Sequence, residues 1–361
     1  MEPVRITFLM PCYAWRPMGG FRVVYEYANR LVARGHRVTV VHPRRLEYPP
    51  PKHLTLLQRL REAPRRIREL FSRPSMRWQQ IGKRVDLQFV ASSHERYIPD
   101  GDVLFATAWH TVQSVLACPS NKGEKCYLIQ HYEAWMGPKA LVDDTWRADL
   151  RKVVISRWLV DTGKALGCSD LEYIPNAVDH ETFRVLRPIE TRPPRVAMLF
   201  STVVFKASAD GVRALQIAKT RFPELQAILF GTDKRQDWIP KWMTYLRDPS
   251  QDCLIRNVYN GSSIILSSSL MEGFPLPPAE GAACGCAIVT TDSGGIREYV
   301  ENGVTGLISP PSDPAALAEN LCVLLADDDL RVGLARAGRS RVLQFNWESS
   351  TEKLEKFIAK V

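Results

Sequence analysis

Short apolar runs and segments of helical periodicity alternate along the first part of the chain. Residues 4–10 are apolar and β-branched, which predicts a buried strand. A loop with Gly19-Gly20 follows, and apolar side chains then recur at helical spacing over residues 23–32. Residues 38–41 form a second apolar run, which Pro43 closes. This order predicts a right-handed βαβ unit in a parallel sheet, with the glycine loop at the carboxyl end of the first strand.

The same pattern occurs twice along the chain. Before residue 184 it predicts strands at 102–106, 126–130, 152–155 and 171–174 and a helix at 157–166. Residues 184–195 are rich in Arg and Pro, which predicts an exposed connector and a domain boundary. Beyond it the pattern predicts strands at 196–200, 227–230, 264–266 and 287–290 and helices at 208–221, 277–284 and from about 346. The fold class is therefore α/β, with two Rossmann-like domains: 1–185 with 346–361, and 195–345.

The composition is that of a globular protein long enough for two cores. Of 361 residues, 45% are hydrophobic and 24% charged, and no apolar run reaches the 18 residues of a spanning helix. The N-terminus lacks the cleavage pattern of a signal peptide. The eight cysteines show neither a disulfide framework nor paired CxxC spacing, so we expect a reduced, cytoplasmic protein. Cys284 and Cys286 lie in an apolar run and are predicted to be core residues rather than metal ligands.

The basic charge is concentrated in one segment. The chain carries a net charge of +9, and residues 52–84 contain ten basic and two acidic residues, a net charge of +8. Apolar residues are interleaved with these arginines, with breaks at Pro64 and Pro74. A basic amphipathic helix binds anionic membrane surfaces, so we expect a peripheral association with the inner face of a membrane. A solvated insertion and a site for an anionic glycan are alternatives, and no motif indicates nucleic acid.

The residues between 269 and 298 carry the clearest chemistry. Glu272 follows a predicted strand, and Glu280 lies eight positions later in the following helix. Carboxylates accept hydrogen bonds from paired sugar hydroxyls, and the backbone N–H groups of such a loop and helix start suit phosphate oxygens. Ser293-Gly294-Gly295 adds a second tight turn near the same edge. The alternative is that Glu272 is a solvated loop residue and that Glu280 complements the helix dipole.

Together these residues resemble the donor-binding region of glycosyltransferase family 4. The resemblance rests on E-G-F-x-L-P-x-x-E and the following A-x-G-x-x-I-V-x-T-x-x-G-G-x-x-E. Further similar landmarks, in the same order as in the family, are Gly19-Gly20, RGHRVTVV, YIPNAVDHETF, FKASADG, ENGVTGLISPP and FNWE, so the resemblance covers essentially the whole chain. It implies the GT-B fold, with two facing Rossmann-like domains, an interdomain cleft that holds the active site, and a C-terminal helix that returns to the N-domain.

The resemblance also implies roles for single residues. Glu280 would hold the ribose and Glu272 the transferred sugar, while Lys206 would neutralise the departing diphosphate. His131 would face the transferred sugar, for which a core histidine is the alternative; His110 is a weaker candidate. The remaining donor-binding candidates are Gly19, Gly20, Gly273, Phe274, Leu276 and Gly231.

Two positions depart from the family pattern. The family usually has an arginine where this chain has Ser201, so the Thr202 hydroxyl, Arg195 or an N-domain loop would have to replace one phosphate contact. Pro275 replaces a small residue and lacks an N–H group, but stays within the candidate donor site. Both departures leave the identity of the donor open.

The resulting interpretation is an enzyme, a retaining glycosyltransferase of the hexosyltransferase type. It would move a hexose or deoxyhexose from a nucleotide-diphosphate sugar to a glycan or lipid-linked acceptor in surface polysaccharide or glycolipid biosynthesis. The family resemblance implies front-face attack with neither a metal ion nor a cofactor. The alternatives are a catalytically weak nucleotide-sugar-binding homologue and another GT-B enzyme, such as a phosphorylase or a sugar-nucleotide epimerase.

Overall fold

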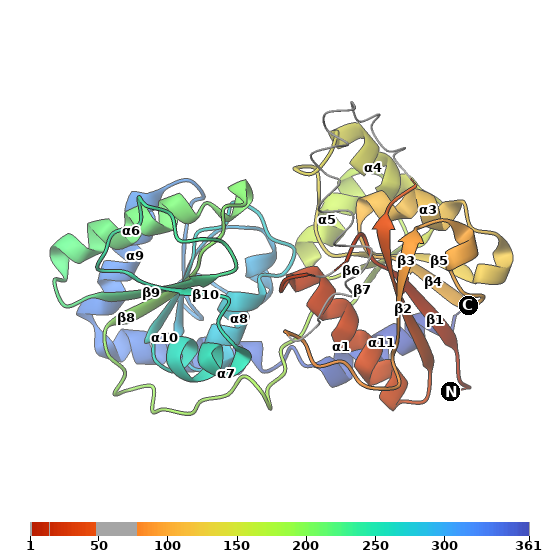
Figure 1. Ribbon diagram of the computed structural model, residues 1–361. Coiled ribbons are helices and arrows are strands. Elements are labelled where there is room, and N and C mark those ends of the chain that lie inside the picture. Colours follow the sequence, from red (N-terminus) through yellow and green to blue (C-terminus); the bar gives the residue numbers. More distant parts are fainter. Residues whose placement is uncertain (1, 14, 48–77, 361) are drawn as a thin grey trace. The chain divides into compact units, whose positions relative to one another are not determined.

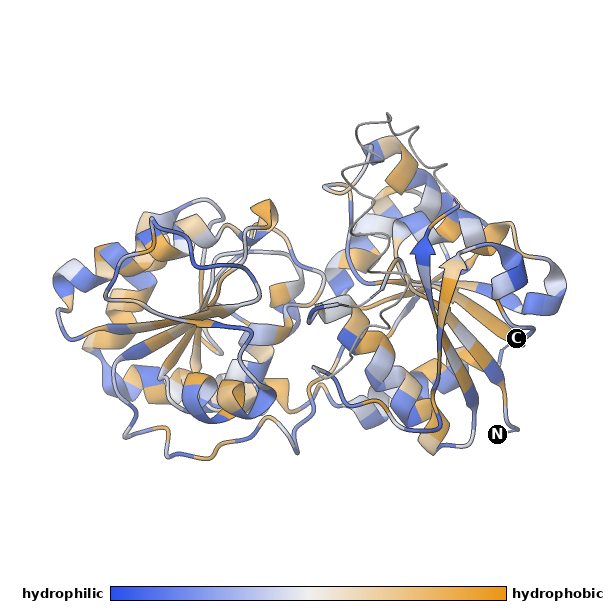
Figure 2. Ribbon diagram, in the orientation of Figure 1, coloured by the Kyte–Doolittle hydropathy of each residue, from blue (hydrophilic) through white to orange (hydrophobic). Residues whose placement is uncertain are grey.

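The computed structural model describes residues 2–13, 15–47 and 78–360, and the chain divides into two compact units (Figure 1). Unit 1 comprises Met1–Val154, Thr162–Tyr173 and Thr351–Val361, and unit 2 comprises Ile155–Asp161 and Ile174–Ser350. In both sheets the strands carry mainly apolar residues, whereas the helices mix apolar and polar positions (Figure 2). This is the pattern of strands buried on both faces.

Unit 1 is built on a seven-stranded parallel sheet with the order β3-β2-β1-β4-β5-β6-β7. The strands are β1 (Arg5–Leu9), β2 (Arg37–Arg45), β3 (Asp86–Ser92), β4 (Val103–Ala106), β5 (Glu124–Ile129), β6 (Arg151–Val154) and β7 (Leu171–Tyr173). Its helical elements are α1 (Gly19–Ala33), α3 (Val112–Leu116) and α4 (Lys139–Arg147), with parts of α5 (Arg157–Ala165) and α11 (Trp347–Ile358). The predicted βαβ unit is confirmed, because β1 and β2 are parallel neighbours joined by α1.

The end of β2 differs from the prediction. The strand continues through Pro43 to Arg45, and Pro43 lies opposite Val90 of β3. On the other side of β2, the pairing with β1 ends at Val41. Beyond that point β2 has a neighbour on one side only, which is where a strand tolerates a residue without an N–H group.

Unit 2 contains a six-stranded parallel sheet with the order β10-β9-β8-β11-β12-β13. The strands are β8 (Arg195–Leu199), β9 (Gln226–Gly231), β10 (Thr244–Arg247), β11 (Ile264–Ser267), β12 (Ala287–Thr291) and β13 (Leu307–Ser309). The helices are α6 (Ser208–Arg221), α7 (Gln251–Cys253), the π-helix Leu254–Tyr259, α8 (Leu276–Ala283), α9 (Pro314–Ala326) and α10 (Asp328–Val342). In both units the strand order reverses beside the first strand, as in doubly wound Rossmann sheets, so the predicted fold class is confirmed.

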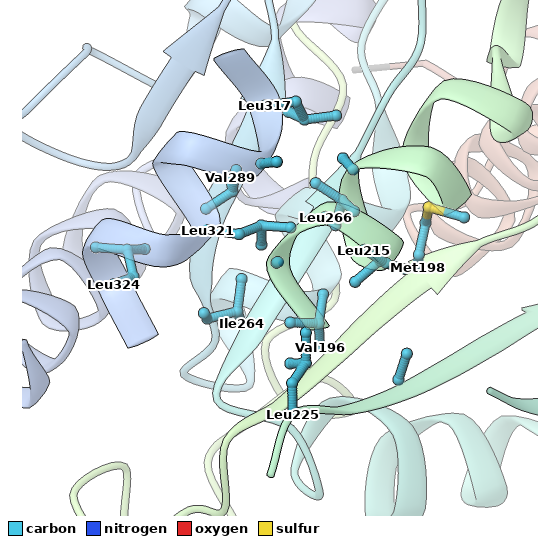
Figure 3. Close-up of a cluster of buried hydrophobic side chains, with 14 of the residues drawn as sticks. Val196, Met198, Leu215, Leu225, Ile264, Leu266, Val289, Leu317, Leu321 and Leu324 are labelled. Atoms are coloured by element: carbon cyan, nitrogen blue, oxygen red, sulfur yellow. The ribbon is translucent and has the colours of Figure 1, made fainter. Parts of the chain in front are cut away.

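The core of unit 2 lies between the sheet and helices α6 and α9. Side chains at alternate positions of β8, β11 and β12 point to this face (Figure 3). The members drawn there include Val196, Met198, Ile264, Leu266, Val289, Leu215, Leu317 and Leu321. This packing fixes the strands whose carboxyl ends carry the candidate site.

Most residues of the segment 184–195 are exposed, as predicted, but Arg192 is buried. Arg192 is only 6% exposed, and its guanidinium donates to the carbonyl oxygens of Tyr259 and Cys284 at 3.3 and 2.6 Å. The prediction of an exposed connector therefore fits most of the segment but not Arg192, whose five donors can satisfy several buried carbonyl groups. Cys284 and Cys286 are buried, as predicted, and burial raises the pKa of the Cys286 thiol to about 12.

The predicted basic helix over residues 52–84 lies largely outside the described residues, and membrane association stays a prediction. In the described ranges, every helix is too short or too polar to cross a membrane.

Candidate functional site

The candidate site of unit 2 begins where β11 and β12 end. An isolated parallel bridge joins Glu272 to Gly294 beyond the ends of these neighbouring strands. In this bridge the backbone N–H of Glu272 donates to the carbonyl oxygen of Ser293 at 2.8 Å. The backbone N–H of Gly295 donates to the carbonyl oxygen of Glu272 at 3.1 Å. The sequence predicts both loops at this edge, and the structure places them in direct contact.

Gly295 is required by this contact. A Cβ atom at position 295 would lie 1.9 Å from the carbonyl oxygen of Gly273, which is backbone and cannot move aside alone. Gly294 has φ +78, and a Cβ atom there would meet the Trp158 ring at 2.8 Å. Glycine at 295 thus allows the two loops to approach closely, and glycine at 294 allows both the positive φ and the close packing of Trp158.

Glu272 and Lys206 form a part-buried ion pair. The Glu272 side chain accepts from Lys206 Nζ at 2.5 Å and from the Ser269 hydroxyl at 2.7 Å, both at Oε1. Lys206 ends a short 3-10 turn before α6 and has 21% of its side chain exposed, compared with 9% for Glu272. A cavity of about 20 Å³ beside them has room for roughly one water molecule. The alternative of a solvated Glu272 is therefore wrong.

Glu280 is the second buried carboxylate. It lies in α8 after the first turn, is 4% exposed, and accepts a hydrogen bond from the Tyr259 hydroxyl at 2.9 Å. Since no acidic residue lies in the first turn of α8, the alternative role of complementing the helix dipole does not fit Glu280.

The loop before α8 is held by aromatic packing. Phe274 is buried and its ring lies 5.2 Å from Tyr299 and 5.6 Å from Phe345, while the Tyr299 hydroxyl donates to the Pro275 carbonyl oxygen at 2.5 Å. Three prolines, at 275, 277 and 278, remove their N–H groups. Leu276 is thus the one residue of 275–278 that can offer a backbone N–H to an anion.

A carboxylate contacts the loop at Ser201, where the family pattern has an arginine. Asp233 Oδ2 accepts from the Thr202 backbone N–H at 2.7 Å and from its hydroxyl at 3.0 Å. Arg195 lies at the opposite end of β8 and donates to Gln226, so it does not stand near Ser201. The structure thus brings Ser201 and Thr202 to the predicted edge but ties them to an acidic side chain.

Gly231 ends β9 at the same edge of the sheet. A Cβ atom at this position would lie 2.1 Å from the Phe200 carbonyl oxygen. Close strand packing therefore accounts for glycine here, and the predicted contact of Gly231 with a donor stays a prediction.

In unit 1 the remaining predicted residues lie at the carboxyl edge of its own sheet. Gly19 and Gly20 are the first residues of α1 rather than part of the preceding loop, and a Cβ atom on Gly20 would lie 3.2 Å from Gln130 Nε2. His131 follows β5; its Nδ1 lies 3.0 Å from the Tyr132 carbonyl oxygen, and its ring packs edge-on against Trp135. The structure does not test which of these residues contact a ligand.

Glu133 is a residue that the sequence reasoning did not select. Its Oε2 accepts from the Trp109 backbone N–H at 2.8 Å, and burial raises the pKa of Glu133 to about 7. Among the described residues, Trp109 Nε1 and His110 Nδ1 are buried without a hydrogen-bond partner, and burial lowers the pKa of His110 to about 4. The feature of the sequence that could have indicated Glu133 is its position two residues after the candidate His131.

We expect Glu133 to make the stability of the protein pH-dependent. A carboxyl whose pKa is raised on folding stabilises the folded state below its ordinary pKa, and this contribution is lost as the pH rises through the folded value. Between pH 4.5 and about 7, the melting temperature of the wild type should therefore fall relative to that of Glu133→Gln. Glu124→Gln, at the exposed start of β5, is the matched control and should follow the wild type. Identical profiles for Glu133→Gln and the wild type would contradict the assignment.

The part of the chain that the structure describes contains no group of three or more His, Cys, Asp or Glu side chains placed to hold a metal ion. Whether the reaction needs a metal ion stays a prediction of the sequence.

The segment that carries this site is similar to known glycosyltransferases. Residues 213–341, which include Glu272 and Glu280, match the family described as "Glycosyl transferases group 1". D-inositol 3-phosphate glycosyltransferase from Corynebacterium jeikeium is 36% identical over 99 residues, 27% of this chain and 24% of that protein. Glycogen synthase from Mycobacterium tuberculosis is 27% identical over 195 residues, 51% of this chain and 47% of that protein. The chain spans about a quarter of the length of the first curated relatives it matches.

Solved structures match nearly the whole chain. Sucrose-phosphate synthase from Thermosynechococcus elongatus superposes with a TM-score of 0.71 and 16% identity, over 99% of this chain and 98% of that one. HepE from Anabaena, solved in complex with UDP-glucose, gives a TM-score of 0.73 and 14% identity, over 99% and 100%. Both units therefore have the α/β folds of GT-B proteins.

Proposed function

We propose that this protein is a retaining glycosyltransferase that moves a hexose or deoxyhexose from a nucleotide-diphosphate sugar to a glycan or lipid-linked acceptor. The observation that carries the proposal is the pair of buried carboxylates, Glu272 in the loop after β11 and Glu280 in α8, the first of which forms an ion pair with Lys206. Both lie within the segment that matches the glycosyltransferase family. The complexes of HepE with UDP-glucose and UDP make a uridine nucleotide the first donor to test.

Each residue has a chemical role in this proposal. Glu280 accepts hydrogen bonds from the ribose hydroxyls, and Glu272 accepts them from the transferred sugar. Lys206 turns from Glu272 toward the diphosphate, where its charge stabilises the negative charge that develops as the glycosidic bond breaks. Leu276 offers its backbone N–H to the same anion. Departing diphosphate takes the acceptor proton, so the new bond forms on the face that the leaving group vacates.

A nucleotide panel tests the donor site. We expect UDP, GDP, dTDP or ADP, or one of their sugars, to raise the melting temperature, with about 2.7 kcal/mol of stabilisation at 100 times the dissociation constant. Glu280→Gln should reduce this shift, because an amide is a weaker acceptor for two hydroxyl groups. Glu319→Gln removes an exposed carboxylate of the same unit and should leave the shift unchanged. A panel without any shift would refute the assignment of Glu280.

One observation favours a second candidate, a homologue that binds nucleotide sugars with weak turnover. Asp233 contacts the loop where a cation would be expected to meet phosphate, and a carboxylate there disfavours a diphosphate. Product formation separates the two functions: a selected nucleotide sugar that binds but is neither transferred nor hydrolysed would support the weaker homologue. A role in surface polysaccharide or glycolipid assembly belongs to the first candidate and is tested by the acceptor that is glycosylated.

A further inference from the structure

Tyr259 stands out in unit 2 because a fully buried side chain directs its one polar atom at a candidate ligand-binding group. Its hydroxyl donates to Glu280 Oε2 at 2.9 Å. The ring packs edge-on against Phe183 at 6.1 Å and against Phe230 at 5.7 Å between centroids. Such packing on two sides leaves the ring little freedom to turn, so the direction of the hydroxyl is fixed by the core.

The backbone around Tyr259 is unusual. The residue ends the π-helix Leu254–Tyr259, and the Asn260 N–H donates to the carbonyl oxygen of Ile255, five residues earlier, at 3.0 Å. A π-helical turn inserts one extra residue and thereby redirects the side chains that follow, and such turns are frequent at functional sites. Without that insertion, Tyr259 would face a different direction from the one that reaches Glu280.

One guanidinium group connects the two elements that carry this pair. Arg192 donates to the Tyr259 carbonyl oxygen at 3.3 Å, at the end of the π-helix. It also donates to the carbonyl oxygen of Cys284 at 2.6 Å, the residue that caps α8, which carries Glu280. The Cys286 thiol donates to the Tyr259 carbonyl oxygen as well, at 3.1 Å. Arg192 thus contacts both the π-helix that carries Tyr259 and the end of α8, the helix that carries Glu280.

We propose that Tyr259 is a positioning residue for the nucleotide ribose, acting through Glu280. The inference rests on the proposed function, in which Glu280 accepts from the ribose 2′- and 3′-hydroxyls. The Tyr259 hydroxyl takes one of about four lone-pair directions of the carboxylate and so fixes the orientation of Glu280. It also compensates in part for the removal of the Glu280 side chain from water.

The test compares UDP with its 2′,3′-dideoxy analogue, by calorimetry on the full chain, or the corresponding pair for whichever nucleotide the panel selects. Tyr259→Phe keeps the ring and removes the hydroxyl. We expect it to weaken UDP binding about tenfold and to leave the affinity for the dideoxy analogue within about twofold, since that analogue cannot use Glu280. Tyr132→Phe, which removes a 2.7 Å hydrogen bond to Asp143 in unit 1, is the matched control and should leave UDP binding unchanged.

The remaining variants separate failure of this inference from failure of the proposed function. Adding Tyr259→Phe to Glu280→Gln should change UDP binding little beyond Glu280→Gln alone. This double variant removes the carboxylate together with its hydroxyl donor, so it provides a second test if Tyr259→Phe alone does not fold. Equal weakening of UDP and the dideoxy analogue by Tyr259→Phe, or no weakening of either, would overturn the positioning role while Glu280→Gln still discriminates between them. If Glu280→Gln itself fails to discriminate, the proposed ribose contact is wrong and the inference fails with it.

Discussion

Replacing Lys206 by methionine is expected to lower kcat for sugar transfer by about 10²–10³-fold. Methionine keeps much of the side-chain volume but removes the charge that, in the proposed mechanism, stabilises the departing diphosphate. The variant should fold, because the Lys206 side chain is partly exposed and its backbone contacts remain, including the hydrogen bond from the Ser268 hydroxyl to the Lys206 carbonyl oxygen. Steady-state kinetics with the selected nucleotide sugar measure the effect, and Lys241→Met, at an exposed position of the same unit, is the control.

The partition between kcat and KM decides what Lys206 does. A loss confined to kcat would mean that the ammonium group acts on charge that develops during bond breaking. A loss confined to KM would place Lys206 in ground-state binding only. Full activity in Lys206→Met would contradict the role that the ion pair with Glu272 suggests.

The second large effect is expected for Gly295→Ala. The added methyl group would lie 1.9 Å from the Gly273 carbonyl oxygen and 2.7 Å from that of Glu272, so the two loops must separate. We expect a loss of about 3 kcal/mol in the free energy of unfolding together with loss of nucleotide binding. Chemical denaturation and the nucleotide thermal shift measure the two consequences separately.

Gly333→Ala is the matched control for this substitution. Gly333 is an exposed residue within α10, and a Cβ atom there would meet nothing within 4 Å. Alanine should therefore raise stability by about 0.5–1 kcal/mol through its higher helix propensity. Wild-type stability and nucleotide binding in Gly295→Ala would show that the two loops do not need to touch.

The predictable part of the fold is the part whose pattern is local. Apolar runs flanked by helical periodicity predicted β1, β2, β8 and β9 and the helices between them. Three strands were missed: β3, β10 and β13, which are outer strands of their sheets and have at least half of their positions only partly buried. Because one edge of an outer strand faces no neighbour, its sequence lacks the continuous apolar run of a central strand.

In the candidate site, too, the features with a local sequence pattern could be predicted and the long-range contacts could not. The spacing of Glu272 and Glu280 and the glycine turns could be read from a short stretch of sequence. The contacts that define their environment could not, because they join distant positions: Lys206 meets Glu272 across 66 residues, and Thr202 meets Asp233 across 31. The sequence showed a serine in place of an arginine at position 201, but the acidic neighbour depends on how the ends of β8 and β9 meet.

The bridge between Glu272 and Gly294 also bears on the timescale of motion at the site. Its two hydrogen bonds join the loops that follow β11 and β12, so the amide hydrogens of Glu272 and Gly295 exchange with solvent only when this bridge opens. The backbone of the loop that carries Glu272 is consequently held in place in the folded protein without a ligand. A ligand that binds at this loop would not need to order its backbone. The loss of conformational entropy that accompanies binding by a flexible loop would therefore be smaller here.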